Sequence, residues 1–129
     1  MKIILVLLLS GWTFLGVGNV FAQENGSAIY QQARDLLKKG YRMEPLRMST
    51  RLEDGTQCMN LMHEYREKAQ DLRQQAQDLF DKTQDLNKLH LGTATVNLLT
   101  CVTCSTQATE YCLRTEIDLI KYRNPGLKE

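Results

Sequence analysis

The clearest pattern in the chain is a tetrad of residues that recurs every seven positions. The letters AQDL occupy positions 69–72 and 76–79, and TQDL occupies positions 83–86. Apolar side chains that lie alternately three and four residues apart over several such repeats are typical of a coiled-coil seam. We therefore expect a long helix over residues 58–88, whose seam consists of Met62, Tyr65, Ala69, Leu72, Ala76, Leu79, Thr83 and Leu86.

The seam alternates small residues with leucine, which allows a partner helix to approach closely. The same spacing also fits an amphipathic helix in the core of a small bundle. The pattern therefore predicts the helix but leaves its partner open, as either another helix of this chain or a second chain.

A second run of apolar positions predicts a helix over residues 94–122. Gly92 precedes this run as a helix breaker, and the letters NPG at 124–126 end it. A short connection between two long helices favours an antiparallel hairpin. The expected apolar stripe of this helix consists of Leu99, Val102, Thr106, Thr109, Leu113, Ile117 and Ile120.

A shorter helix is expected over residues 27–39, where Ser27 can cap the start and Gly40 can end the helix. Residues 40–57 show no sustained period and are expected to form a loop, with at most a turn of helix. The predicted fold is all-α: a short N-terminal helix beside a long, coiled-coil-like antiparallel helical hairpin that is stapled by disulfides.

The first 22 residues have the layout of a secretory signal peptide. Lys2 is followed by an unbroken apolar run, and the letters VFA before Gln23 place small residues at the positions that signal peptidases require. The apolar run is short for a bilayer span. We expect residues 1–22 to be cleaved and residues 23–129 to form one exported domain, periplasmic or secreted, without a membrane span.

The balance of charges excludes one class of partner. The chain has 16 basic and 15 acidic side chains, interspersed along its length. Loss of Lys2 with the signal peptide would make the two numbers equal. A net charge near zero argues against a nucleic acid or an anionic membrane recognised by bulk electrostatics.

All four cysteines lie beyond the expected cleavage site, and an even number in an exported chain indicates two disulfides. On one continuous helix, Cys104 and Cys112 would lie about 12 Å apart, and Cys101 and Cys112 about 16 Å apart. A disulfide requires Cα atoms within about 7 Å. The spacing therefore predicts the pairs Cys58–Cys112 and Cys101–Cys104, with a bond to a second chain as the alternative.

Two chemical alternatives use the same sulfur atoms. The CxxC sequence at 101–104 could act as a redox carrier, although such motifs usually follow a strand at a helix N-terminus. Covalent haem is excluded, because Ser105 stands where a histidine is required. A copper(I) site is the other alternative, since soft sulfur and imidazole ligands gather within six residues: Cys58, Met59, Met62 and His63.

The sequence offers few candidate residues for hydrolytic catalysis. His63 and His90 are accompanied by neither a nucleophile elbow nor a glycine-rich phosphate loop. The sequence favours a non-enzymatic exported protein without a cofactor, which acts by protein–protein interaction or self-association as an adaptor, an inhibitor or a chaperone-like protein. A periplasmic copper-binding protein and a redox carrier that uses Cys101 and Cys104 are the alternatives.

Overall fold

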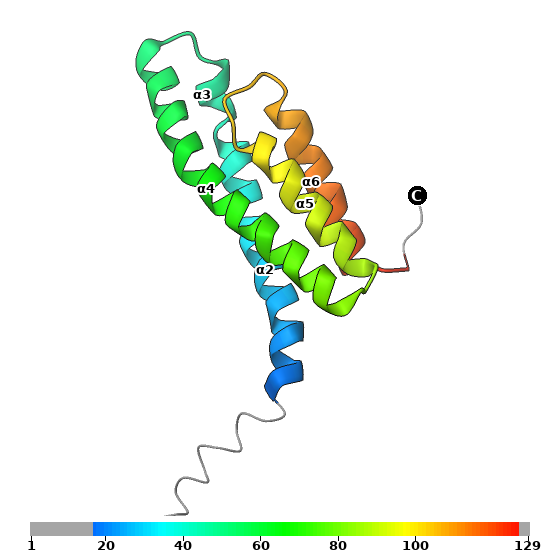
Figure 1. The fold of residues 1–129 in the computed structure, drawn as a ribbon. Coiled ribbons are helices and arrows are strands. Elements are labelled where there is room, and N and C mark those ends of the chain that lie inside the picture. Colours follow the sequence, from blue (N-terminus) through cyan, green and yellow to red (C-terminus); the bar gives the residue numbers. More distant parts are fainter. Residues whose placement is uncertain (1–16, 127–129) are drawn as a thin grey trace, which may run out of the picture.

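The computed structural model of the chain describes residues 17–126, with side chains from residue 26 onward, and this range is helical without strands (Figure 1). The expected all-α class is confirmed. Of the expected signal peptide, residues 1–16 lie outside the described part and residues 17–22 belong to the first helix. The helices are α2 (Val17–Arg42), α3 (Glu44–Met48), α4 (Leu52–Thr83), α5 (Asn87–Cys101) and α6 (Ala108–Arg123).

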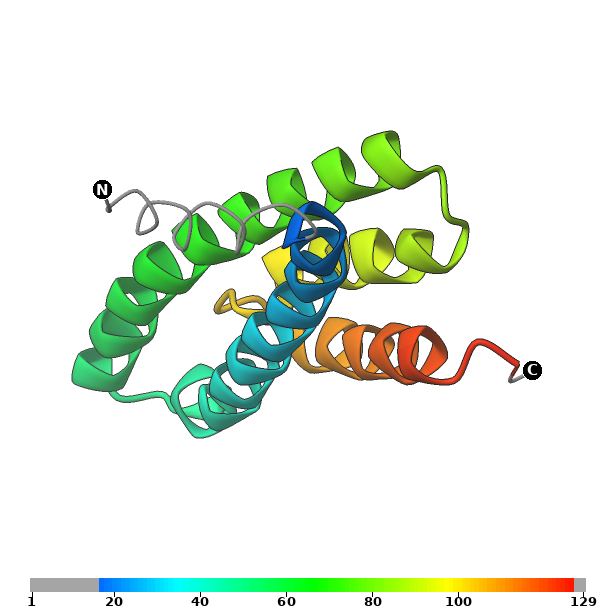
Figure 2. The ribbon, with the colours of Figure 1, turned by 90° about the horizontal axis from the view of Figure 1, so that it is seen from below.

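The four longer helices pack as a bundle in which α2 and α5 occupy the centre. Each of these two helices contacts both α4 and α6, and they also contact each other. Figure 2 shows α2 lying across the face that the other three helices form. Helices α5 and α6 make an antiparallel hairpin, and α3 joins the end of α2 to the start of α4.

Helix α4 is the helix that the seven-residue repeat predicts, shifted toward the N-terminus. The Ser49 hydroxyl accepts a hydrogen bond from the Arg51 N–H and donates one to the Asp54 carboxylate, which orders the chain before the first turn. Acidic residues in the first turn also suit the positive end of the helix dipole. The expected loop over 40–57 is therefore too long, since α2 extends to Arg42 and α4 begins at Leu52.

The turn after α4 does not use Gly92, which lies inside α5. Helix α4 ends where Gln84 adopts a left-handed backbone with φ of 53°, and the Gln84 N–H donates to the Phe80 carbonyl. The Asp85 carboxylate then accepts a hydrogen bond from the Asn87 N–H at 3.0 Å, at the first residue of α5. The prediction of a break at Gly92 was wrong because glycine is tolerated within a helix.

The expected continuous helix over 94–122 was also wrong, because α5 ends at Cys101 and α6 begins at Ala108. Local side-chain hydrogen bonds organise the connection between them. The Thr103 hydroxyl donates to the Thr100 carbonyl and accepts from the Ser105 N–H, while the Ser105 hydroxyl accepts from the Gln107 N–H. Such bonds offer the backbone an alternative to helical pairing.

The core lies where α2, α4 and α5 meet. Leu72, Leu91 and Leu98 are almost completely buried, and each such leucine stabilises the fold by about 1.5 to 3 kcal/mol. Small residues between them allow the helix backbones to approach closely. These buried small residues are Ala33 of α2, Ala69 and Ala76 of α4, and Ala94 of α5.

Helix α2 passes so close to the α5–α6 hairpin that Gly40 has no room for a side chain. A Cβ atom at this position would lie 2.5 Å from the Cys101 Sγ, 3.1 Å from the Cys112 Sγ and 3.2 Å from the Cys101 carbonyl oxygen. Gly55 and Gly92 are also helical, and a Cβ atom at either position would meet nothing within 4 Å. Gly40 is therefore a packing requirement at the crossing of α2 with the hairpin.

None of the helices within residues 17–126 combines the length and the hydrophobicity that crossing a membrane requires.

Candidate interaction surface

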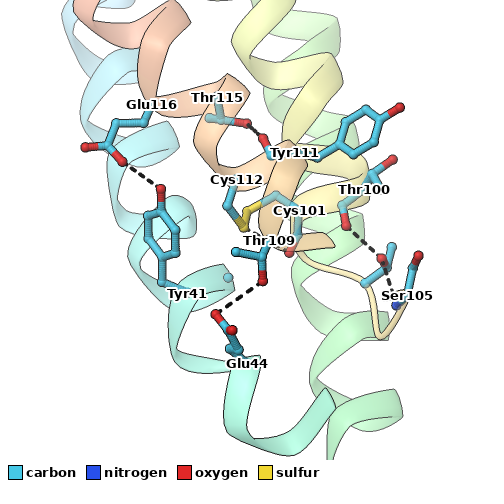
Figure 3. The surroundings of a disulfide bond; sticks show 12 residues. Tyr41, Glu44, Thr100, Cys101, Ser105, Thr109, Tyr111, Cys112, Thr115 and Glu116 are labelled. Atoms are coloured by element: carbon cyan, nitrogen blue, oxygen red, sulfur yellow. Dashed lines mark hydrogen bonds between the residues drawn. A yellow bond between two sulfur atoms is a disulfide. The ribbon is translucent and has the colours of Figure 1, made fainter. Parts of the chain in front are cut away.

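The two disulfides are Cys58–Cys104 and Cys101–Cys112, so the predicted pairs were wrong. The prediction assumed one continuous helix, on which Cys101 and Cys112 are far apart. Because the chain reverses between α5 and α6, these two residues face each other across the hairpin with their Cα atoms 4.6 Å apart (Figure 3). Cys104 lies in the connection and reaches Cys58 of α4, with a Cα separation of 6.1 Å.

The connection between α5 and α6 is also held by Arg47, which follows α2 on the short helix α3. The guanidinium donates to the carbonyls of Gly40, Cys101 and Thr103 at 2.6, 2.8 and 2.8 Å. Burial lowers the pKa of the Arg47 guanidinium, and the nearby Glu44 carboxylate partly offsets this. Glu44 itself accepts a hydrogen bond from the Thr109 hydroxyl at the start of α6.

The disulfides remove the thiolates on which both chemical alternatives depend. Cys58 is bonded to Cys104, which leaves the expected copper ligands without a free thiol. Of the other ligands, Met59 and His63 are exposed and Met62 is half-buried. Within the described range, no group of three or more His, Cys, Asp or Glu side chains could hold a metal ion. Cys101 and Cys104 are bonded to different partners, so the expected CxxC redox pair does not form.

The seven-residue seam is mostly used inside the chain. Its central residues are buried against the chain's own helices: Ala69, Leu72, Ala76 and Leu79. Met62 and Tyr65 are half-buried at the edge of the same core. Thr83 and Leu86 are exposed at the turn between α4 and α5. The central part of the seam therefore packs within the bundle of the chain's own helices.

Three residues of the apolar stripe expected over 94–122 lie at the surface, whereas Val102 of the same stripe is buried. Leu113, Ile117 and Ile120 of α6 are 52, 52 and 44 % exposed. At about 100° per residue these three side chains share one face of α6. The residues of α6 that are buried lie on another face, and they are Ala108, Cys112, Thr115 and Leu119. The spacing of the stripe was correct, but the break before α6 changes which face meets the core.

A groove between α2 and α6 borders this stripe. It has a volume of about 320 Å³ and is lined by Tyr30, Arg34, Leu37, Lys38, Tyr41, Glu116, Leu119 and Ile120. The Tyr41 hydroxyl donates to the Glu116 carboxylate at 2.6 Å across the two helices (Figure 3). Burial and this hydrogen bond raise the pKa of Tyr41, so the phenol stays protonated and holds the carboxylate in place.

The basic side of the groove was missed at the sequence level. Arg34 and Lys38 lie one helical turn apart on α2, and Arg34 lies over the Tyr30 ring at 5.9 Å. A signal for Arg34 was present, since no acidic residue stands three or four positions from it. Asp35 does lie three positions before Lys38, but in the structure it pairs with Lys39.

Asp118 provides a pH-dependent test of the α5–α6 packing. Burial raises the pKa of this carboxyl. A hydrogen bond from the Asn97 amide at 2.9 Å lowers it in part, as do the charges of Lys121 and His90. A raised pKa in the folded state means that folding favours the protonated form. Stability is therefore lost as the pH rises from the unfolded pKa, about 3.9, through the folded pKa.

We expect Asp118→Asn to increase the free energy of unfolding at neutral pH, with the gain vanishing near pH 3. Asp85 is the matched control, because hydrogen bonds from the Asn87 N–H and Lys88 lower its pKa. Asp85→Asn should therefore destabilise the protein at neutral pH and have little effect at low pH. Urea unfolding of both variants from pH 3 to pH 7 measures this, and changes of the same sign would contradict it.

No protein-family model matches the chain, and neither a curated protein nor a solved structure shows a significant match to it.

Proposed function

We propose that this protein is an exported, non-enzymatic helical protein that acts by binding another protein, or a second copy of itself, through the exposed stripe of α6. The observation that carries the proposal is the exposure of Leu113, Ile117 and Ile120 on one face of a helix. Three aliphatic side chains at this spacing are the pattern that one helix presents to another in helix-mediated recognition. Burying them against a partner removes apolar surface from water, which favours association.

The stapled architecture supports this role. One disulfide ties the α5–α6 connection to α4, and the other joins α5 to α6 across the hairpin. A surface on a rigid helix loses little conformational entropy when a partner binds. Disulfides persist in oxidising compartments, and this agrees with the signal-like N-terminus in pointing to the periplasm or the extracellular space. An adaptor, an inhibitor or a chaperone-like protein would each use such a surface.

The test compares two pairs of serine substitutions in the full-length oxidised protein. We expect the protein either to form a concentration-dependent dimer by light scattering or to bind one protein of the exported fraction of its source at fixed stoichiometry. Leu113→Ser with Ile117→Ser should weaken that complex by at least about tenfold. Leu52→Ser with Val96→Ser is the control, since Leu52 of α4 and Val96 of α5 are also exposed.

The control pair should leave the complex unchanged, and circular dichroism should show both double variants to be folded. A protein that stays monomeric at high concentration and takes no stoichiometric partner would overturn the proposal. Equal weakening by the two pairs would overturn it as well, because the binding surface would then not be the stripe of α6.

A further inference from the structure

The groove between α2 and α6 has two walls of different chemistry. Leu37 and Leu119 are buried at its base, and Ile120 continues the base outward to the exposed stripe. Arg34 and Lys38 stand on the α2 side. A ligand that fills this groove would therefore meet hydrocarbon along one edge and positive charge along the other.

The two cations lack carboxylate partners. Among the described residues, neither Arg34 nor Lys38 forms an ion pair, whereas the neighbouring Lys39 is paired with Asp35 at 3.2 Å. Glu116 is the one carboxylate that lines the groove, and it accepts the hydroxyl of Tyr41. The groove thus keeps two positive charges that a ligand with carboxylates could pair with at its rim.

We propose that the groove binds an acidic amphipathic helix of another protein, a conclusion that rests on the proposed function and defines the chemistry of its partner. Aliphatic side chains on one face of that helix would pack on Ile120 and Ile117. Aspartate or glutamate residues along the adjacent flank would pair with Arg34 and Lys38. This is the helix-in-groove mode of recognition, with charge setting the orientation.

A second copy of the chain fits the groove less well. Helix α4 carries more acidic than basic residues, but Leu72 and Leu79 are buried in the core, and its exposed apolar residues Leu52 and Met59 lie two turns apart. Helix α6 exposes aliphatic residues but carries three acidic and three basic side chains, Glu110, Glu116 and Asp118 against Arg114, Lys121 and Arg123. Neither helix of a second copy joins three exposed aliphatic side chains on one face to an excess of acid.

An anionic membrane is also a poorer match. The groove is concave, and Glu116 and Glu110 lie on the same helix as the apolar stripe, where a negatively charged surface would repel them. The net charge of the whole chain is only +1. A discrete helix can place its carboxylates opposite Arg34 and Lys38 and avoid Glu116, which a lipid surface cannot do.

The experiment titrates the oxidised full-length protein with three designed peptides of about 18 residues, long enough for a marginal helix. All three carry leucine along one face. They differ on the adjacent flank, which carries glutamate in the first peptide, glutamine in the second and lysine in the third. We expect the glutamate peptide to bind at least about tenfold more tightly than the other two. Amide resonances of α2 and α6 around Arg34, Lys38 and Ile120 should shift, and those of the outer face of α4 should not.

Charge reversal then tests the pairing directly. Lys38→Glu should lower the affinity for the glutamate peptide by at least about tenfold and raise the affinity for the lysine peptide. Arg73→Glu is the matched control, since Arg73 is an exposed cation on α4 away from the groove, and it should change neither affinity. Ile120→Ser should lower the affinity for all three peptides, and Val96→Ser on α5 should leave these affinities unchanged.

Equal affinity for the three peptides, or shifts confined to other helices, would overturn this inference. A third result would also overturn it. In that result no peptide binds, but the protein binds vesicles of phosphatidylglycerol and phosphatidylcholine, and Lys38→Glu abolishes the vesicle binding. The proposed function fails by a different result, which is the absence of any complex that depends on Leu113 and Ile117. If Lys38→Glu leaves a native complex intact but the stripe variants abolish it, the proposed function is supported and the inference of an acidic helix as the partner is contradicted.

Discussion

Replacing both Cys58 and Cys104 with alanine should lower the free energy of unfolding by about 4 kcal/mol. The bond closes a loop of 46 residues, and the chain-entropy model assigns about that stabilisation to a loop of this length. The loss should be concentrated at the start of α4. Cys58 is the one residue that is buried in the stretch 52–68 of this helix, and the next buried residue is Ala69.

Hydrogen exchange measured by mass spectrometry tests this expectation locally. In the Cys58→Ala, Cys104→Ala variant, amides of the first turns of α4 should exchange much faster, while those of the α5–α6 hairpin stay protected. The matched variant lacks Cys101 and Cys112, whose loop of 11 residues gives about 3 kcal/mol in the same model. That variant should instead expose the ends of α5 and α6. An identical exchange pattern in the two variants would show that the bonds do not act on separate segments.

Gly40→Ala should lower the free energy of unfolding by about 3 kcal/mol, the upper part of the range for overpacked sites. The added methyl group would lie 2.5 Å from the Cys101 Sγ and 3.2 Å from the Cys101 carbonyl oxygen. Neither atom can move freely, because one belongs to a disulfide and the other accepts a hydrogen bond from Arg47. Helix α2 must therefore shift away from the hairpin, which also weakens the contacts of the neighbouring Leu36 and Leu37.

Gly55→Ala and Gly92→Ala provide the controls for this substitution. Both positions are helical and have open space where the methyl group would be, so alanine should raise the free energy of unfolding by about 0.5 to 1 kcal/mol through helix propensity. Urea denaturation of the three variants measures the contrast. A Gly40→Ala protein as stable as the two controls would show that α2 does not lie against the Cys101–Cys112 bond.

The helices and part of the core could be predicted from the sequence because their signals are local. The repeated tetrad predicted α4, and the buried residues Leu72 and Leu79 are those of its seam. The small residues of the seam, Ala69 and Ala76, are buried as well. The helices that pack on this seam could not be predicted from a local pattern. In the structure they are α2 and α5 of the same chain.

The disulfide pairs and the exposure of the α6 stripe could not be predicted, because both depend on one turn without glycine or proline. The connection at 102–107 is made by hydroxyl groups of Thr103 and Ser105, which are weaker sequence signals than a helix breaker. Overlooking that turn gave the wrong partner to Cys112. It also grouped Ile117 with the buried Val102 on one helix face, although α6 packs through a different face.

The two disulfides interleave along the chain, and this has a consequence for how the protein is made. The cysteines follow one another as 58, 101, 104 and 112, and each native bond skips the next cysteine in line. A chain that enters an oxidising compartment from its N-terminus presents Cys101 to Cys58 before Cys104 arrives. Oxidation in order of appearance would therefore form a non-native bond first. Oxidation in that order would require an exchange between thiols and disulfides before the two native pairs could form.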